Sequence, residues 1–232
     1  MVIDTSKKIP VLLYHRIVDK KDAIGRHKIY VFKDTFYKQM SYLKKQGFSS
    51  ISFEEVHQGI VAEKPVIITF DDGYVDNYEI AFPILKEFGF KAVIFIVTQL
   101  KRNDWGIAEG EPALDMMNEK MILEMQQYGI EFGGHTMYHK DLLKLNGDEA
   151  RKEIAGCKAD IERILNKNIL SFAYPFGAMN EEIKQMVADC GYSFGISTNT
   201  GPDNFFEDLL QIRRKEIHPQ TKMFSFRRKI KV

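Results

Sequence analysis

Short apolar runs alternate with amphipathic stretches along nearly all of this 232-residue chain. The runs are four to seven residues long and almost continuously apolar, as in strands that are buried on both faces. The stretches between them, ten to eighteen residues long, have helical spacing. This pattern predicts parallel strands covered by helices. Seven or eight such units in one chain of this length favour a closed or nearly closed α/β barrel over a doubly wound sheet, and no strand is followed by GxGxxG.

The expected elements follow from these runs and from the residues that punctuate them. With no internal repeat and no low-complexity linker, residues 1–232 are predicted to form a single domain. Loops are expected at Asp19–Val31 and Gln99–Asp115, and the second is long enough to be functional. Strands are expected at Pro10–Tyr14, Phe48–Ile51, Val66–Phe70, Lys91–Val97, Gly129–Phe132, Ile169–Ala173, Tyr192–Ser197 and Leu210–Ile217. Helices are expected at Asp34–Gln46, Phe53–Ala62, Tyr74–Phe88, Asn118–Gln127, Asp148–Leu165 and Asn180–Cys190.

The formal net charge of +1 predicts no general attraction to nucleic acid, but the charge is uneven. From Arg213 to Val232 there are eight Lys or Arg residues and one acid, Glu216. The basic tail, about residues 219–232, is expected to be a solvated, frayed chain end. The alternative is a functional role for this segment, namely peripheral contact with an anionic membrane or a phosphate-bearing substrate, helped by Phe224 and Phe226.

Nothing in the sequence indicates export. Met1–Pro10 is polar and lacks the apolar core of a signal peptide, and no run of about 18 apolar residues occurs. Cys157 and Cys190 are isolated, so neither a disulfide framework nor a zinc ribbon is predicted. We expect a cytoplasmic location.

The most informative segment is VIITFDDG, in which Asp71 and Asp72 come where a buried strand should end. Gly73 allows the backbone to turn sharply away from the strand. Two adjacent carboxylates in such a place repel each other and resist desolvation. A cation or a proton offsets that cost, so a ligand is expected here.

A second segment, GGHTMYH, places His135 and His139 at i, i+4 after another predicted strand. On a helical turn this spacing brings both imidazoles to one face, where they can bind one metal ion. Gly133 and Gly134 are expected to let the chain turn into that segment. The zinc-protease motif HExxH is excluded, because Thr136 stands where its glutamate would be.

Two histidines and one carboxylate leave positions open for water and substrate on Zn²⁺ or a similar divalent ion. Such an ion lowers the pKa of water and polarises a carbonyl group. The second aspartate can then serve as general base toward that water. His15, the two aspartates, the two histidines and the segment Tyr174–Phe176 all follow predicted strands, at the end of a barrel where catalytic groups gather.

From about Pro10 to Ile217 the chain resembles the polysaccharide deacetylase family, carbohydrate esterase family four, with its NodB-homology domain. The family's TFDDG motif is present as Thr69–Gly73, and its H(S/T)xxH motif as His135–His139. The third motif region is found in FAYPFG, Phe172–Gly177. An early YH together with FAYP(F/Y)G is similar to the branch that acts on poly-N-acetylglucosamine.

The resemblance implies a distorted (β/α)7 barrel of the TIM type and one bound divalent ion, zinc first, with cobalt, nickel or iron as alternatives. It implies that Asp71 is the catalytic base and that Asp72, His135 and His139 hold the metal. It also implies an oxyanion contact from the backbone N–H of Phe176. We assign Tyr174, Pro175 and Phe176 to substrate binding, together with Trp105, for which apolar packing is an equal alternative.

The sequence departs from the family at three places. Ala173 stands where the third motif usually begins with Arg, so the usual partner of the base is missing. We do not identify the fourth motif, an Asp-Trp segment. The fifth usually supplies a late His that protonates the leaving amine, and LLYH at His15 has its pattern on the first strand. Because the first and last strands of a barrel can be neighbours, we assign His15 as general acid, with His218 as the rival.

The sequence therefore predicts a metal-dependent hydrolase that removes the N-acetyl group from an amino sugar in a polysaccharide or glycan precursor. The missing Arg and Asp-Trp motifs leave a non-catalytic carbohydrate-binding protein on the same barrel as the alternative. An aspartate phosphoacceptor domain would leave both histidines idle. A two-carboxylate glycosidase fits worse, because adjacent aspartates cannot flank a glycosidic bond at the ~5–9 Å separation required.

Overall fold

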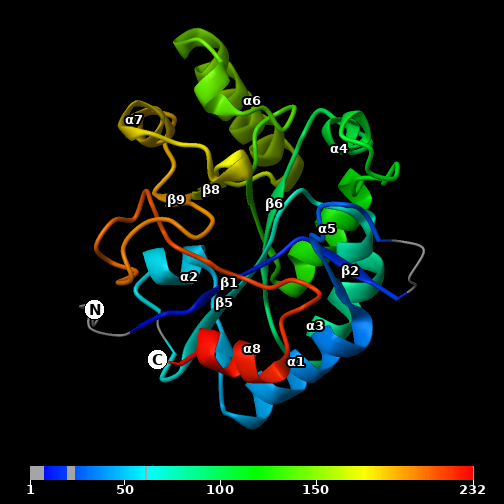
Figure 1. Cartoon of the computed structure of the whole chain (residues 1–232). Coiled ribbons are helices and arrows are strands. Elements are labelled where there is room, and N and C mark those ends of the chain that lie inside the picture. The colour runs from blue at the N-terminus through cyan, green and yellow to red at the C-terminus, as the bar shows by residue number, and fades with distance from the viewer. Residues whose placement is uncertain (1–7, 20–23, 61, 232) are drawn as a thin grey trace.

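The computed structural model of the chain describes residues 8–19, 24–60 and 62–231, and a parallel sheet curled into a distorted barrel lies at its centre (Figure 1). The main path of the sheet runs β10-β1-β5-β6-β7-β8-β9, and β4 (Ser49–Ser50) adds to β5. The predicted α/β barrel is therefore confirmed. The strands on this path are β1 (Val11–Tyr14), β5 (Pro65–Phe70), β6 (Val93–Ile96), β7 (Glu131–Gly134), β8 (Ser171–Ala173), β9 (Phe194–Ile196) and β10 (Lys215–Glu216).

The segment between β9 and β10 continues the sheet from its last strand toward its first. Ile212 pairs in parallel with Ile196 of β9, and Ser197 N donates to Ile212 O at 2.9 Å. Farther along, β10 pairs with β1, and Ile217 N donates to Leu13 O at 2.9 Å. The predicted last strand thus lies between β9 and β1, so groups from both ends of the chain meet.

Side chains of β5 alternate between two apolar clusters, as a strand with both faces buried requires. Ile68 packs in the cluster shared with the helices, whereas Ile67 packs in a second cluster with Val93 and Phe95. Thr69 and Asp71 follow Ile67 at intervals of two residues. The same alternation therefore carries Asp71 to the side of the strand on which Ile67 lies.

Helices cover the sheet broadly as the sequence predicts, and the predicted capping box of Ser52 and Glu55 is present. The second helix ends at His57 because Gly59 adopts a left-handed conformation (φ 77°), and the expected continuation to Ala62 includes position 61, outside the described residues. The helices are α1 (Lys33–Lys45), α2 (Phe53–His57), α3 (Phe82–Phe88), α4 (Asp104–Ala108), α5 (Glu119–Tyr128), α6 (Gly147–Leu165), α7 (Glu181–Asp189) and α8 (Met223–Lys229), with the π-helical η2 (Asn77–Ala81) and the 3₁₀ turns η3 (Leu142–Lys144) and η4 (Pro175–Gly177).

Two segments predicted as loops contain secondary structure. The first includes β3 (Tyr30–Phe32), which pairs in parallel with β2 (Arg16–Val18) directly after β1. The second contains the short helix α4. Neither segment shows a periodic signal, because three-residue strands and a five-residue helix are too short to produce one.

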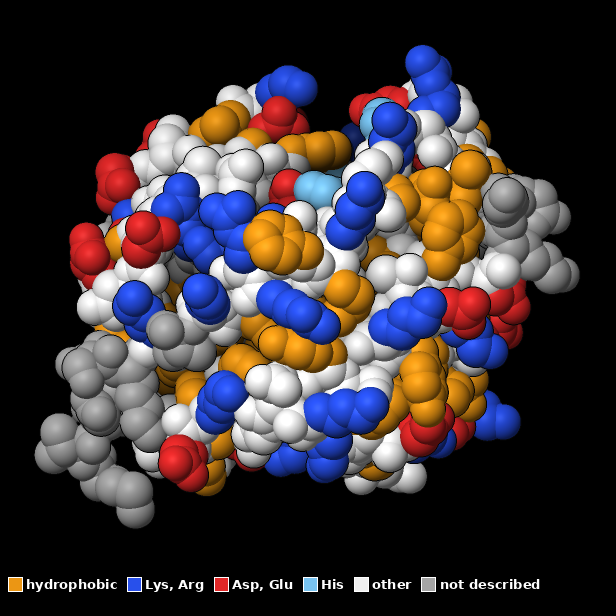
Figure 2. Space-filling model, turned by 60° about the horizontal axis from the view of Figure 1, so that its bottom comes forward, with side chains coloured by type: hydrophobic (Ala, Val, Ile, Leu, Met, Phe, Trp, Pro, Cys, Tyr) orange, Lys and Arg blue, Asp and Glu red, His pale blue; other side chains and the backbone are white. Residues whose placement is uncertain are grey.

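The basic C-terminal segment is not frayed over its described part, as its residues form α8. Phe226 is fully buried, and its ring lies 6.4 Å from that of Tyr42 on α1. Phe224 on the same helix is 71% exposed, so the two phenylalanines predicted to act together are separated. Lys and Arg side chains lie scattered among hydrophobic ones on the face shown in Figure 2. None of the described helices is both long and apolar enough to cross a bilayer.

Candidate active site

Asp71 and Asp72 lie directly after β5, and both are buried. Asp71 N donates to Tyr14 O at 3.0 Å, which joins the start of the turn to β1. Asp72 has a left-handed backbone (φ 75°), a conformation that is uncommon outside glycine and is often found at functional sites. Gly73 continues the turn at φ 84°, and a Cβ there would lie 2.7 Å from Ile96 Cγ2. The sharp turn predicted for Gly73 is confirmed.

His135 and His139 follow β7, but not on the helical turn that their spacing suggests. Thr136 and His139 have φ angles of 67° and 53°, so the segment is an irregular loop that brings the two imidazoles together. Gly133 and Gly134 lie within β7 rather than in a turn. A Cβ on Gly133 would lie 2.6 Å from the Phe95 ring, and one on Gly134 would lie 2.5 Å from the Tyr192 hydroxyl. These glycines therefore permit close packing, not a bend.

Asp72, His135 and His139 form a cluster whose potential ligand atoms all lie within 4.8 Å of one another. The Nε2 atoms of His135 and His139 lie 3.4 Å and 3.3 Å from Asp72 Oδ1. His135 Nδ1 is 2.8 Å from Ala173 O. Because a carbonyl oxygen only accepts hydrogen bonds, Nδ1 carries the proton. The lone pair of neutral His135 therefore lies on Nε2, which faces Asp72.

This cluster fits a divalent cation. Within the described chain, Asp72 Oδ1 and His139 Nδ1 are buried without a hydrogen-bond partner. One carboxylate oxygen and two imidazole nitrogens are a common donor set for zinc and related ions. A cation here would supply the partner that Asp72 Oδ1 lacks.

Burial and charge act against each other on the pKa values of these groups. Burial works to raise the pKa of Asp72, but the nearby imidazoles of His135 and His139 hold it well below the usual range. Burial lowers the pKa of His139. For His135, burial is outweighed by Asp72 and Asp71, so its pKa is raised. The negative charge of Asp72 thus favours a positive charge at this point, as expected from the sequence.

Arg214 is the partner that the sequence comparison with the family did not supply. Its Nη1 and Nη2 donate to Asp71 Oδ1 and Oδ2 at 2.6 Å and 2.7 Å, and its Nε donates to Ser197 O at 2.7 Å. The expectation that the base lacks an orienting arginine is therefore wrong. The guanidinium comes from the segment before β10 instead of from position 173. Arg214 was not recognised in the sequence because it lies within a run of basic residues at the start of the C-terminal segment.

The Arg214 guanidinium also sets the charge of Asp71. Burial works to raise the pKa of Asp71, but the positive charge of Arg214 and its paired hydrogen bonds outweigh burial and lower that pKa. Asp71 is therefore held as a carboxylate. Both of its oxygens are fixed in one orientation by the fork of the guanidinium.

His15 lies directly after β1, and two residues, Asn77 and Asp76, hold it and the residues that follow it in place. Asn77 Nδ2 donates to His15 O at 2.7 Å. Asp76 accepts hydrogen bonds from Arg16 Nε at 2.9 Å and from Ile17 N at 3.2 Å. Asp76 and Asn77, which come one helical turn after the aspartate pair, thus position the loop that carries His15.

A cavity of about 380 Å³ brings most of the predicted site residues together. His15, Asp71, Asp72, His135 and His139 all line it, whereas His218 is exposed and does not. The placement favours His15 over His218 as the general acid.

Aromatic side chains form part of the cavity wall. Trp105 stacks on His139 with ring centroids 4.2 Å apart, and Phe176, 55% exposed, meets the same imidazole edge-on at 4.6 Å. Trp105 follows Asp104 at the start of α4, so an Asp-Trp pair does occur in the chain. Tyr174 and Pro175 are buried away from the cavity, and the Tyr174 hydroxyl donates to Leu210 O at 2.8 Å. Their predicted contact with substrate is therefore not supported by their placement.

The cavity also contains residues that the sequence did not single out. His27, an exposed residue, lines it beside Glu109, with Nε2 2.9 Å from Glu109 Oε2. Glu111 accepts a hydrogen bond from His27 N at 2.8 Å. Glu216 of β10 also lines the cavity. No local motif marks these residues, because they are brought together by loops far apart in the chain.

Comparison with known proteins gives consistent results. A family model described as polysaccharide deacetylase matches residues 58–195. YxkH of Bacillus subtilis, whose name provisionally assigns it to the polysaccharide deacetylases, is 30% identical over 217 residues, which cover 91% of this chain and 72% of that protein. The poly-beta-1,6-N-acetyl-D-glucosamine N-deacetylase of Staphylococcus aureus is 28% identical over 214 residues, covering 80% and 70% of the two chains.

A solved structure is similar over the whole barrel. The Streptococcus pyogenes deacetylase PplD, determined in complex with acetate, matches with a TM-score of 0.84 and 31% sequence identity. The match covers 97% of this chain and 99% of that one.

Proposed function

This chain belongs to the polysaccharide deacetylase family and is therefore an enzyme that removes acetyl groups from a glycan. We propose that it hydrolyses the acetamide of an N-acetylated amino sugar, with Asp71 as base and His15 as acid. The observation that carries this proposal is the arrangement of one cavity. It contains a cluster suited to a cation, a carboxylate held ionised beside it, and a histidine that follows the neighbouring strand β1.

Asp72, His135 and His139 would hold the metal, and we propose zinc, with cobalt, nickel or iron as alternatives. A divalent cation there supplies two effects, a lower pKa for water and a more electrophilic acetamide carbonyl. Because His135 donates through Nδ1 to Ala173 O, its Nε2 is ready to bind without a change of tautomer.

Asp71 would accept a proton from the attacking water. Its hydrogen bonds with Arg214 fix the carboxylate plane, and its lowered pKa keeps it ionised. Both effects favour a base that is in place before the substrate arrives. His15 would then protonate the departing nitrogen, so that acetate and a free amine are released. The oxyanion contact from the backbone N–H of Phe176 stays a prediction.

The alternative of a non-catalytic sugar-binding protein was based in part on the missing arginine partner of the base. Arg214 provides that partner, so this argument for the alternative no longer holds. The cytoplasmic location stays a prediction, as does membrane contact by the C-terminus. The proposed substrate is an N-acetylated polymer or a precursor of one, and which of the two it is depends on the compartment in which the enzyme works.

The test is acetate release from β-1,6- and β-1,4-linked N-acetylglucosamine oligomers by the metal-loaded enzyme. We expect release by wild type, and a fall of at least about 10²-fold in Asp71→Asn, whose metal content should be unchanged. Circular dichroism confirms that the variant is folded. Full activity in Asp71→Asn would exclude the mechanism, and absence of release from every acetylated oligomer by a metal-loaded wild type would exclude the substrate class.

A further inference from the structure

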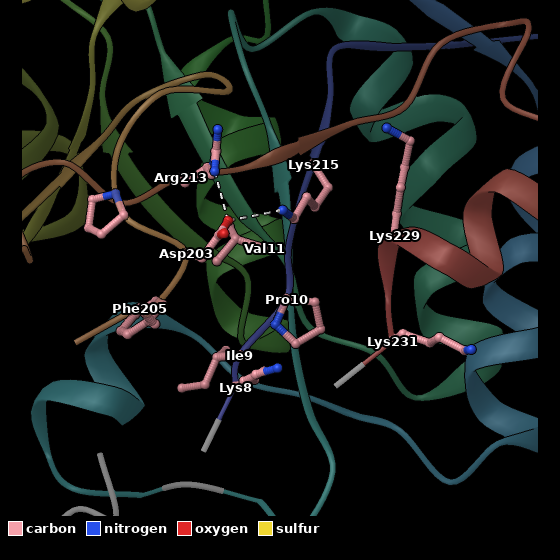
Figure 3. Close-up of a pocket in the computed structure, with 11 residues that line it drawn as sticks. Lys8, Ile9, Pro10, Val11, Asp203, Phe205, Arg213, Lys215, Lys229 and Lys231 are labelled. Carbon is pink, nitrogen blue, oxygen red and sulfur yellow. Dashed lines mark hydrogen bonds and ion pairs between the residues drawn. The ribbon is translucent and has the colours of Figure 1, made fainter. Parts of the chain in front are cut away.

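A second cavity, which shares no lining residue with the first, lies near the N-terminal end of β1 (Figure 3). Its volume is about 270 Å³, and the buried side chains of Ile9, Val11 and Phe205 contribute an apolar part of its wall. The charged residues around it come from three regions of the chain. They are Lys8 before β1, Asp203, Arg213 and Lys215 around β10, and Lys229 and Lys231 at the end of α8.

Strand alternation explains how one segment builds both cavities. Arg214 reaches Asp71, and Glu216 lines the catalytic cavity. Arg213 and Lys215, which alternate with them, line the second cavity. The run of basic residues in the sequence is thus divided between the two sides of the strand.

The described lining of this cavity is strongly positive. Among the described residues, five Lys or Arg side chains and one acid, Asp203, line it, a net formal charge of four positive. Arg213 Nη1 and Lys215 Nζ share that acid, at 2.7 Å and 3.8 Å from Asp203 Oδ1, as the dashed lines of Figure 3 show. Lys8 also acts on Asp203 electrostatically, so three cations share one carboxylate, whereas no ion pair or hydrogen bond is found for the ammonium groups of Lys229 and Lys231 within the described part of the chain.

Isolated surface lysines are ordinary and need no ligand, but this group differs in two respects. Its members line one concavity from segments that are far apart in sequence, and that concavity has an apolar part of its wall. Like charges collected in this way repel one another, and an anion would offset the repulsion.

We propose that this cavity binds a phosphate group, either of a soluble phosphate compound or of an anionic lipid headgroup. Arginine and lysine together are the usual protein partners of phosphate, the first through its planar fork and the second as a flexible point charge. The volume is slightly below the range of about 300–1,000 Å³ typical of small-molecule sites, so it suits one phosphate or diphosphate rather than a larger organic ligand. The proposal is independent of the deacetylase chemistry.

The experiment is calorimetric titration of the full, metal-loaded chain with inorganic phosphate and pyrophosphate at low salt. The test variant is Lys229→Gln/Lys231→Gln, and the matched control is Lys120→Gln/Lys152→Gln, which removes two charges from exposed lysines elsewhere. We expect pyrophosphate affinity to fall at least tenfold in the test variant and to be unchanged in the control. Anion binding to the metal site is common to all three proteins, so the difference reports the second cavity.

Flotation with vesicles distinguishes the two sources of phosphate. Binding to phosphatidylglycerol vesicles but not to phosphatidylcholine vesicles, lost in the test variant and competed by pyrophosphate, would identify the headgroup. Pyrophosphate binding without vesicle binding would identify a soluble phosphate. Absence of both, or equal losses in the test and control variants, would overturn the proposal. Acetate release should be unchanged in both double variants, which separates failure of this site from failure of the catalytic one.

Discussion

Arg214 and Asp71, 143 positions apart in the chain, form a buried ion pair in which Nη1 and Nη2 each donate to one carboxylate oxygen. Arg214 Nη1 also lies 3.2 Å from the Thr69 hydroxyl, which itself donates to Leu12 O at 2.7 Å. The pair thus connects the segment before β10 to the end of β5, and Thr69 connects β5 to β1. It both orients the base and joins the two ends of the barrel.

Replacing Arg214 with Gln should move the acidic limb of the kcat/KM profile to higher pH. Without the guanidinium, burial is opposed only by the weaker effects of His135 and His15, so the pKa of Asp71 rises and the base is protonated over a wider acidic range. The pH profile of acetate release checks this. Arg213→Gln is the matched control, because it removes the same charge one position away, where Arg213 binds Asp203. An acidic limb that stays in place in Arg214→Gln would contradict the role of the pair.

The same substitution should lower stability. Breaking a buried ion pair by removing one partner typically costs roughly 3–5 kcal/mol, because the other charge is left buried. The sign follows from the lowered pKa of Asp71. Its contribution to stability is present above the unfolded value of 3.8 and is lost as pH falls through the folded value. The difference in unfolding free energy between wild type and Arg214→Gln should therefore narrow below about pH 4.

Much of the barrel could be predicted from the sequence because its strands are continuous apolar runs and its helices are long enough to show a period. Asp72, His135 and His139 could be placed together for the same reason, since the ends of parallel strands meet at one edge. The side of the strand on which Arg214 lies could not be predicted. β10 is too short to show an alternation of polar and apolar side chains, so nothing separates Arg214 from Arg213 and Lys215. Its role depends on closure of the barrel, which joins residues far apart in the chain.

The irregular loop of the two histidines was mispredicted for a different physical reason. Spacing of i, i+4 is necessary for a pair on a helix but does not require one. Here left-handed backbone at Thr136 and His139 achieves the same approach. Backbone strain of this kind has no signature in side-chain polarity, and it recurs at Asp72 and Phe176 in the same cavity.

Asp72→Asn and His139→Asn should each lose the bound metal, whereas Asp71→Asn should keep it. Asparagine is chosen because it tolerates the left-handed backbone of both positions, which alanine would strain. Elemental analysis of the purified proteins is the measurement. About one divalent ion per chain is expected in wild type and in Asp71→Asn. Retention of stoichiometric metal in Asp72→Asn would contradict the assigned ligand set.

His15→Gln should reduce kcat by roughly 10²- to 10⁴-fold, the usual effect of removing a general acid. His218→Gln should have little effect, because His218 is exposed and does not line the cavity. The two variants remove the same chemical group, so they form a matched pair. A large loss in His218→Gln with His15→Gln unaffected would reverse the assignment.

Asn77→Asp should reduce kcat by roughly 10- to 10²-fold without changing KM or metal content. The substitution keeps the shape of a fully buried side chain but removes the amide donor that holds His15 O at 2.7 Å. A displaced acid costs rate, not affinity, because the nitrogen it protonates must be reached in the transition state. A change in KM of the same size as the change in kcat would point to a general structural role instead of a positioning one.

Gly133→Ala should destabilise the protein, and Gly147→Ala should not. A Cβ on Gly133 would lie 2.6 Å from the Phe95 ring and 2.7 Å from Ser171 O, so either the ring or the neighbouring strand β8 must move. Overpacking of this kind costs about 1–3 kcal/mol, or a fall in Tm of roughly 2–4 °C for each kcal/mol in a chain of this size. Gly147 begins α6 with open space around it, and alanine there is a better helix former. Thermal unfolding of both variants is the measurement. Since β7 leads directly into the metal ligands, equal Tm values for the two variants would show that the site does not depend on this close contact between strands.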